Sequence, residues 1–235
     1  MKLKSKQKKQ DQLSSYMTQR RQILNKNTSF AVQEAYKQLR TNIRFCIRDQ
    51  KCKKFCLTSG QASEGKSITL LNLAISIAQT GKRVLLIDAD LRRPTIARLL
   101  VEKATPGLSE VLVGDVSVSE AVRTGIYPNL DIIFSGEKPP NPSEVLSSER
   151  MHELIETSAE YYDYILVDTP PVNVVTDACV VANLLDGVLL LVRESRSNKE
   201  TVRQAISNLQ LTGANILGYI LNGVVSETSK HYGDY

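Results

Sequence analysis

The chain has 235 residues, 42% hydrophobic and 23% charged, which suits one α/β domain with short appendages. Residues 1–26 carry eight Lys or Arg and one Asp, a charge of +7, whereas the whole chain carries +5. The remainder is therefore slightly acidic, and we expect no nucleic-acid partner. The cysteines lack the spacing of a zinc site and suit a reducing compartment (Cys46, Cys52, Cys56 and Cys179).

Residues 1–28 show no hydrophobic periodicity and are predicted to form a basic, flexible leader. Its lysines are either simply solvated or drawn to an anionic membrane surface, and both alternatives stay open. No apolar stretch follows these basic residues, which argues against a signal peptide. The longest apolar run, residues 184–192, contains Asp186 and is too short to span a membrane.

Residues 31–48 are predicted to form a helix with two different sides. Apolar residues on one side are expected to pack on the domain (Val32, Ala35, Tyr36, Leu39, Ile43, Cys46 and Ile47). The other side gathers charges (Glu34, Lys37, Arg40, Arg44 and Arg48). Phe45 lies among these charges, where packing on the chain's own core does not explain it. The charged side is either a plain solvated face or a contact with another molecule.

The rest of the chain alternates short apolar strands with helices. Strands are predicted at residues 55–58, 84–87, 130–134, 164–167, 188–192 and 216–221, with helices at 70–78, 148–160 and 198–211 and short helices and loops over 94–125. This order indicates βαβ units and a mostly parallel sheet. The strands are apolar throughout, which indicates an α/β fold with helices on both faces of the sheet.

Residues 60–67 match the phosphate-binding pattern G-x-x-x-x-G-K-[ST], directly after a strand and at the start of a helix. In this context the backbone N–H groups of the loop and of the helix N-terminus cradle phosphates. Lys66 reaches the transferred phosphate and the Ser67 hydroxyl binds Mg²⁺. The sequence therefore predicts a P-loop NTPase with ATP and Mg²⁺ as cofactors, and a nucleotide held by the loop (Gly60, Glu64, Gly65, Lys66, Ser67 and Ile68).

Carboxylates follow two of the predicted strands. Asp88 and Asp90 are two residues apart at a strand end, so both side chains are expected to point the same way. Asp168 ends another apolar strand, the arrangement that places an Asp beside Mg²⁺ in this class of fold. We therefore expect three carboxylates around one nucleotide.

Together these segments resemble the bacterial tyrosine kinases, the kinase subunit of capsule and exopolysaccharide systems, from about residue 30 to the C-terminus. That family pairs the P-loop with a second motif, D-x-D-x-R, which here is residues 88–92, and with a strand ending in the sequence of residues 168–171, Asp-Thr-Pro-Pro. Septum-site and partitioning ATPases share the fold but carry an extra lysine near the start of the phosphate loop. This chain has Thr58-Ser59-Gly60 there, which argues against them.

The resemblance implies roles for individual residues. The catalytic group comprises Lys66, Asp88 as proton acceptor, Asp90 and Arg92, with metal ligands at Ser67, Asp90 and Asp168. In the wider fold an Asn at the position of Asn222 hydrogen-bonds adenine; a simple turn is the alternative. Glu34, Lys37 and Arg40 resemble the ring-assembly motif E-x-x-R-x-x-R, although Lys37 replaces its first arginine. The expected phosphate acceptors are Tyr232 and Tyr235 in a flexible tail, residues 224–235.

The implied function is an ATP-dependent tyrosine kinase that phosphorylates its own tail and regulates polysaccharide synthesis and export. Residues 29–223 would form the kinase domain. The implied partners are a membrane-anchored co-polymerase whose cytoplasmic tail activates the kinase, further copies in a ring, and a cognate tyrosine phosphatase. The chain would then lie in the cytoplasm against the inner face of the cell membrane. The alternative is a nucleotide-dependent assembly ATPase of the partitioning type without kinase activity.

Overall fold

The computed structural model describes residues 18, 20–48 and 50–224. Within these residues, seven strands form one sheet in the order β3-β4-β2-β5-β1-β6-β7. All neighbouring strands run parallel except β3 and β4, which are antiparallel. The strands are β1 (Lys53–Ser59), β2 (Val84–Asp88), β3 (Val122–Tyr127), β4 (Leu130–Ile133), β5 (Tyr164–Asp168), β6 (Gly187–Arg193) and β7 (Ile216–Asn222).

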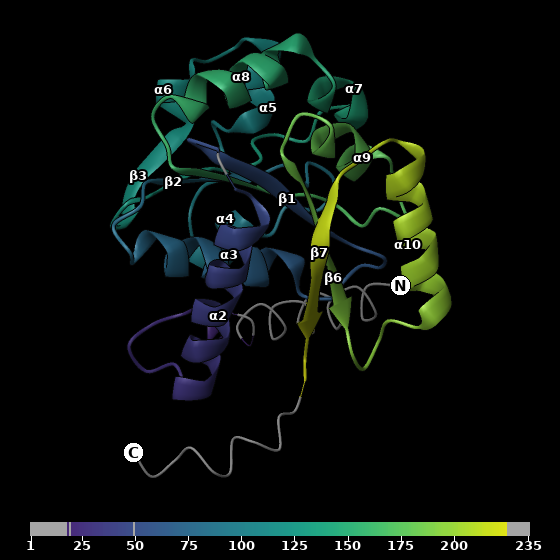
Figure 1. Ribbon diagram of the computed structural model, residues 1–235. Helices are drawn as coiled ribbons and strands as arrows, with labels where there is room; N and C mark the ends of the chain where they lie inside the picture. The colour runs from purple at the N-terminus through teal and green to yellow at the C-terminus, as the bar shows by residue number, and fades with distance from the viewer. Residues whose placement is uncertain (1–17, 19, 49, 225–235) are drawn as a thin grey trace, which may run out of the picture.

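Helices cover both faces of this sheet (Figure 1), as the apolar strands predicted. They are α2 (Phe30–Cys46), α3 (Lys66–Ala78), α4 (Ile96–Leu100), α5 (Leu108–Val113), α6 (Val118–Ala121), α7 (Pro142–Leu146), α8 (Glu149–Ala159), α9 (Asp177–Ala182) and α10 (Lys199–Leu211). The mostly parallel α/β fold is thereby confirmed.

Alternate residues of each strand supply two separate cores. Phe55 and Leu57 of β1 pack with α2, α3 and α4 on one face. Cys56 between them packs with α5, α7, α8, α9 and α10 on the other face. Because successive side chains of a strand point to opposite faces, a strand buried on both sides has no polar position left in its interior. Polar chemistry is therefore confined to the strand ends.

The six expected strands are all present, and the structure adds β3, α7 and α9, which the sequence analysis did not predict. The side chains of β3 are exposed or only half-buried, and Gly125 within it adopts a φ of +79°. Such a strand at a sheet edge has no continuous apolar run. Helix α9 has only six residues, too few to show a helical period.

Helix α2 buries less of its apolar side than expected. Ile43 is buried and Leu39 is half-buried, but Val32 is 41% exposed and Cys46 is also exposed. Phe45 is exposed as expected, at 59%. The helix lies against α3 (Figure 1). Only part of its apolar stripe is buried there, and the rest is exposed.

The ordered domain begins earlier than the expected boundary at residue 28, which is a correction to the predicted leader. Ile23 and Leu24 are buried in the core, 8% and 5% exposed. Asn72 of α3 fixes this segment: its Oδ1 accepts from the Leu24 N–H at 2.8 Å and its Nδ2 donates to the Gln22 carbonyl at 2.8 Å. This contact joins residues about fifty positions apart, so local sequence patterns do not reveal it.

No helix in the described part of the chain combines the length and apolar character needed to cross a membrane. Residues 225–235, which include the expected acceptors Tyr232 and Tyr235, lie outside the described residues.

Replacing Asn72 with Ala should lower the free energy of unfolding by roughly 1–3 kcal/mol, because it leaves the buried Leu24 N–H without a partner and removes the bond to the Gln22 carbonyl. Urea unfolding measures this. Asn183→Ala is the matched control, since this exposed side chain makes one hydrogen bond, and it should change stability by no more than about 0.5 kcal/mol. Equal effects of the two substitutions would contradict the anchoring role of Asn72.

Candidate active site

The phosphate loop between β1 and α3 adopts its turn because Gly65 has a φ of +101°, which strongly favours glycine. A Cβ at Gly65 would also lie only 2.5 Å from Asn222 Nδ2. The Asn222 amide instead donates to the Glu64 carbonyl at 2.8 Å. Asn222 was expected to contact the adenine. It lies at the end of β7, and its side chain contacts the phosphate loop next to Gly65.

The segment after β6 holds the other side of the loop. The Ser197 hydroxyl donates to the Glu64 carboxylate, which is fully buried and also accepts from the Gln61 N–H at 3.1 Å. Arg193 and Arg196 both donate to the Ser63 carbonyl, at 3.4 and 3.3 Å. Sequence analysis missed these residues, because nothing in the local pattern after a strand indicates a contact with a loop 130 residues away.

Asp88 and Asp168 lie side by side at the carboxyl ends of β2 and β5, where they are register partners. Both are completely buried. Burial raises the pKa of Asp88 well above the usual carboxyl value, and the nearby charges of Asp168 and Asp90 raise it further. A carboxyl group with a raised pKa is a stronger proton acceptor when ionised, which is the property expected of Asp88.

Lys66 and Ser67 open α3 beside Asp168. Burial raises the pKa of Asp168 to about 7, whereas the Lys66 ammonium and the Ser67 hydroxyl act to lower it. Neither carboxylate oxygen of Asp168 accepts a hydrogen bond of normal geometry from any described residue. An ionised, buried carboxylate without donors is costly unless a cation is supplied. The residues present therefore fit Mg²⁺ between Asp168 and the Ser67 hydroxyl.

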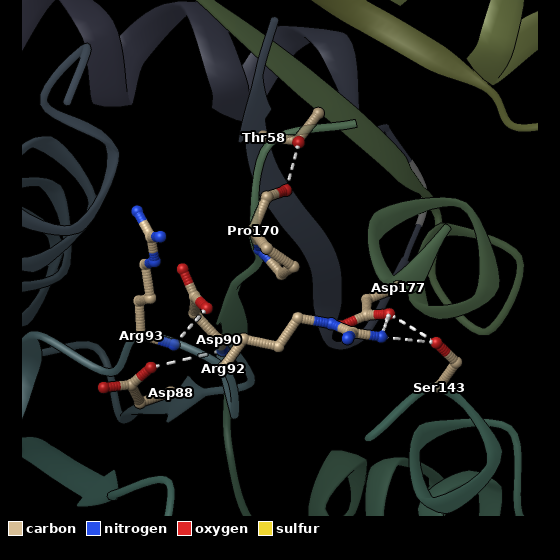
Figure 2. A network of polar contacts seen from close by, with 8 residues as sticks. All are labelled: Thr58, Asp88, Asp90, Arg92, Arg93, Ser143, Pro170 and Asp177. Carbon is tan, nitrogen blue, oxygen red and sulfur yellow. Dashed lines mark hydrogen bonds and ion pairs between the residues drawn. The ribbon is translucent and has the colours of Figure 1, made fainter. Parts of the chain in front are cut away.

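Asp90 and Asp88 also shape the loop that follows β2 (Figure 2). Asp90 Oδ1 accepts from the Arg93 N–H at 2.9 Å, and Asp88 accepts from the N–H groups of Asp90 and Ile96, at 3.3 and 3.2 Å. Asp90 is buried as well, 8% exposed. Among the described residues, however, no three acidic, His or Cys side chains converge as a preformed metal site. Asp88, Asp90 and Asp168 nevertheless lie near enough for their charges to raise the pKa of Asp88, so the three carboxylates share one region of the site.

Arg92, expected in the catalytic group, is engaged elsewhere. Figure 2 shows its side chain extending away from Asp88 to a bidentate ion pair with Asp177 of α9, at 2.8 and 3.0 Å. Ser143 of α7 accepts from Arg92 at 2.9 Å and donates to Asp177 at 2.6 Å. Asp177 is fully buried and was not among the expected site residues. In this arrangement Arg92 ties the loop after β2 to α7 and α9, a positioning role.

The structure thus brings Lys66, Ser67, Asp88 and Asp168 together at the carboxyl edge of the sheet, with Asp90 on the adjoining loop. The three expected ring residues are on α2, away from this edge. There Lys37 pairs with Glu34 of its own helix at 2.6 Å, and Arg40 donates to the Ser76 carbonyl of α3 at 2.7 Å.

Substitutions of Arg92 and Asp177 should have non-additive effects on the free energy of unfolding, because the two side chains form an ion pair. Arg92→Gln alone leaves a buried charge on Asp177 without its partner and should lower the free energy of unfolding by roughly 3–5 kcal/mol. The double substitution Arg92→Gln with Asp177→Asn removes that charge and should recover at least about 1 kcal/mol. Urea unfolding of the four proteins tests this; strictly additive losses would contradict it. The exposed pair Lys82–Asp163 is the control, with an expected coupling below about 1 kcal/mol.

Protein stability should also depend on the ionisation of Asp168. Its folded pKa of about 7 lies above its unfolded value, so the folded state binds more protons between the two and the free energy of unfolding falls as pH rises through this window. Without nucleotide and Mg²⁺, the free energy of unfolding of Asp168→Asn should therefore increase by roughly 2–4 kcal/mol relative to that of the unsubstituted protein as the pH rises from about 5 to about 8. Exposed Asp115→Asn should show no such trend, and parallel pH profiles for all three proteins would refute the effect.

Comparison with known proteins agrees with this geometry. Residues 52–216 match the family described as an AAA domain. The chain is 41% identical over 202 residues to the tyrosine-protein kinase YwqD of Bacillus subtilis strain 168, covering 86% of this chain and 85% of that protein. The kinase domain of the Escherichia coli tyrosine kinase ETK superposes with a TM-score of 0.80 at 36% identity, over 83% of this chain and 76% of that one.

The septum site-determining protein MinD of Pyrococcus horikoshii OT3, solved with Mg-ADP, is more distant. Its TM-score is 0.62 at 24% identity, over 72% of this chain and 70% of that one, which shows the shared fold alone. The two kinase relatives named above, by contrast, match along most of both chains, at 41% and 36% identity. The chain therefore belongs to the family of bacterial tyrosine-protein kinases.

Proposed function

We propose that this tyrosine kinase transfers the γ-phosphoryl group of ATP to Tyr232 and Tyr235 of its own C-terminal segment, and that this modification regulates capsule or exopolysaccharide synthesis and export. The observation that carries the chemistry is the buried pair Asp88 and Asp168 beside Lys66. Lys66 supplies a fixed positive charge, and one member of the pair supplies a proton acceptor. An assembly ATPase would use the same groups on water, so the kinase relatives carry the choice of tyrosine as acceptor.

The steps assigned to the chain's own residues are binding, orientation and proton transfer. The loop from Gly60 to Ile68 positions the phosphates through its backbone N–H groups. Lys66 neutralises charge on the transferring group. Asp88 accepts the phenol proton, which a tyrosine with an ordinary pKa of about 10 must lose as its oxygen attacks phosphorus. When bound by Ser67, Asp168 and Asp90, Mg²⁺ supplies further neutralisation of phosphate charge.

The C-terminal segment suits an acceptor for reasons of sequence. After Val224 the chain continues for eleven residues containing two tyrosines, two serines and a glycine. Fully extended, these residues span at most roughly 40 Å. That reach allows the tail of one copy to enter the active site of the next, so we assign the transfer to neighbouring copies.

Assembly would use α2. Besides Glu34, Lys37 and Arg40, the helix presents Phe30 and Phe45, which are 63% and 59% exposed. Two exposed aromatic side chains on one helix favour burial against another protein. A ring of copies joined through this helix is the arrangement in which a tail meets a neighbour's site repeatedly. The ion pair between Glu34 and Lys37 within one copy would have to rearrange to pair across copies.

The remaining parts of the proposal concern the cell. A membrane-anchored partner whose cytoplasmic tail activates the kinase would hold it against the inner face of the cell membrane, and a cognate tyrosine phosphatase would reverse the modification. One of the solved structures with the same fold is the chimerical protein CapA2B2, 32% identical with a TM-score of 0.77, over 81% of this chain and 84% of that one. A fused chimera of this kind is consistent with a kinase that works with a second polypeptide.

Mixing two differently substituted chains tests the proposal. One carries Lys66→Met and an intact tail, and the other is active but carries Tyr232→Phe and Tyr235→Phe. With ATP and Mg²⁺, mass spectrometry should find phosphate on Tyr232 and Tyr235 of the Lys66→Met chain only when the active chain is present. When the Lys66→Met chain is incubated alone, the rate of tail phosphorylation should be at least about 100-fold lower than in the unsubstituted protein, because the charge on the transferring group is no longer neutralised.

Exposed Lys138→Met in place of Lys66→Met is the matched control and should phosphorylate its own tail at the normal rate. Phosphate on the Lys66→Met chain in isolation would disprove the role of the loop. A blank on that chain in the mixture, with a strongly phosphorylated unsubstituted protein, would show that each tail serves its own site. ATP hydrolysis without any phosphotyrosine would favour the assembly ATPase.

A further inference from the structure

A cavity lies at the end of the sheet opposite the active site. It is a cavity of about 560 Å³ at the amino ends of β1, β2 and β5, closed on one side by α2 and the end of α3. The phosphate loop and Asp168 lie at the carboxyl ends of the same strands. The cavity is therefore separate from the nucleotide site, and none of the proposed catalytic residues lines it.

Its charged lining is strongly basic. Five cationic side chains and one carboxylate among the described residues face it: Arg40, Arg44, Lys51, Lys53, Lys82 and Asp163. The carboxylate is already occupied, since it accepts from Lys82 Nζ at 3.2 Å and from the Arg83 N–H at 2.8 Å. That leaves about four positive charges in one hollow without an acidic partner among its lining residues.

Two of the cations are held in place by neutral oxygen atoms. Arg40 is half-buried and donates to the carbonyl and hydroxyl oxygens of Ser76 at 2.7 and 3.3 Å, and Lys53 donates to the Gln50 carbonyl at 3.2 Å. These bonds orient the side chains without neutralising them. The side chains of Arg44 and Lys51 make no ion pair or hydrogen bond with any other residue in the described ranges. Arg40 and Lys53, held in place, together with Arg44 and Lys51 form a site that suits a compact anion of high charge.

We propose that this cavity binds a phosphotyrosine from the C-terminal segment of a second copy of the chain. A phosphotyrosine carries about −1.5 to −2 charges and three acceptor oxygens, which suit the planar donor sets of Arg40 and Arg44. The hollow favours a protruding anionic side chain over a flat lipid surface, and its volume is that of a ligand pocket. The inference rests on the proposed phosphorylation of Tyr232 and Tyr235.

Geometry favours a second copy as the source. Val224 follows the carboxyl end of the edge strand β7, whereas the cavity lies at the amino ends of β1, two strands away, and β5, three strands away. With strands about 4.8 Å apart and about 3.3 Å per residue, straight lines to these two strand ends measure roughly 25 and 27 Å. Eight extended residues, the interval from Val224 to Tyr232, reach only roughly 28 Å. This leaves almost no length for Tyr232 to pass around α2, which lies beside β7, so the cavity within its reach is that of a second copy. Tyr235, three residues further along, reaches roughly 38 Å, so the argument from distance applies to Tyr232.

Occupation of the cavity would connect modification to assembly. Arg40 lines the cavity and also belongs to the helix proposed to join copies in a ring. A phosphorylated tail bound to Arg40 and Arg44 competes for that helix with the next copy. The kinase would then recognise its own product at a place remote from the transfer chemistry.

Binding of a synthetic peptide tests this independently of kinase activity. The peptide spans residues 226–235, is chemically phosphorylated at Tyr232 and Tyr235, and carries a fluorescent label. The receptor is the full chain with Tyr232→Phe and Tyr235→Phe, so that its own tail cannot compete. Fluorescence anisotropy should show at least tenfold tighter binding than for the unphosphorylated peptide. Arg44→Gln with Lys51→Gln should weaken binding of the phosphopeptide at least tenfold, while circular dichroism reports an intact fold.

The matched control removes two exposed lysines outside the cavity, Lys103→Gln with Lys138→Gln, and should change the affinity less than twofold. Equal losses in both double variants would overturn the cavity as the binding site. Equal affinity for both peptides would overturn the role of the phosphate group. Vesicles of phosphatidylglycerol form a third arm: binding to them that depends on Arg44 and Lys51, with no phosphopeptide binding, would replace the tail by a membrane surface. Because the peptide is phosphorylated chemically, a kinase that proves inactive does not affect these outcomes.

Discussion

Two carboxylates forced next to each other in a dry environment constrain the rest of this active site. Asp88 and Asp168 are register partners on neighbouring parallel strands, and both are fully buried. Two ionised carboxylates at that separation repel each other, so one proton, a cation or a nearby ammonium must offset their charge. Lys66 lies near enough to lower the pKa of Asp168. The same arrangement that costs stability in the free protein creates a proton acceptor and a place for a divalent cation.

Such a site needs rigid support, and the supporting residues come from distant parts of the chain. Ser197 binds the Glu64 side chain on one side of the phosphate loop, and Asn222 binds the Glu64 carbonyl on another. Arg92 and Asp177 fix the loop that carries Asp90. In each case a charged or polar side chain is satisfied by a partner in the protein interior, where such a bond is stronger than in water. Positions of the phosphate loop and of the carboxylates thus depend on side chains that have no direct role in transfer.

The sequence predicted the parts of this site that depend on local pattern. A phosphate loop and an Asp at the end of an apolar strand are each defined within about ten residues, and the structure places Lys66, Ser67, Asp88 and Asp168 at one edge. Asp177 was missed because it opens a helix of six residues with no detectable period. The burial of Leu24 was missed because it depends on Asn72, and strand β3 because its residues are exposed or half-buried. Contacts between distant residues are set by the whole fold, and no short segment records them.

Helix α3 connects the active site at the carboxyl ends of the strands with the basic cavity at their amino ends. Helix α3 begins at Lys66 in the active site and ends at Ala78, with Ser76 bound to Arg40 at the basic cavity. Thirteen residues of helix span roughly 20 Å. Charges that far apart and partly solvated are largely screened at physiological salt, where the Debye length is about 8 Å. An anion in the cavity therefore has little direct influence on the pKa of Asp88 or Asp168. We therefore expect phosphorylation to act on catalysis through the proposed contacts of α2 with other copies, which makes assembly, rather than the field inside one copy, the quantity to measure.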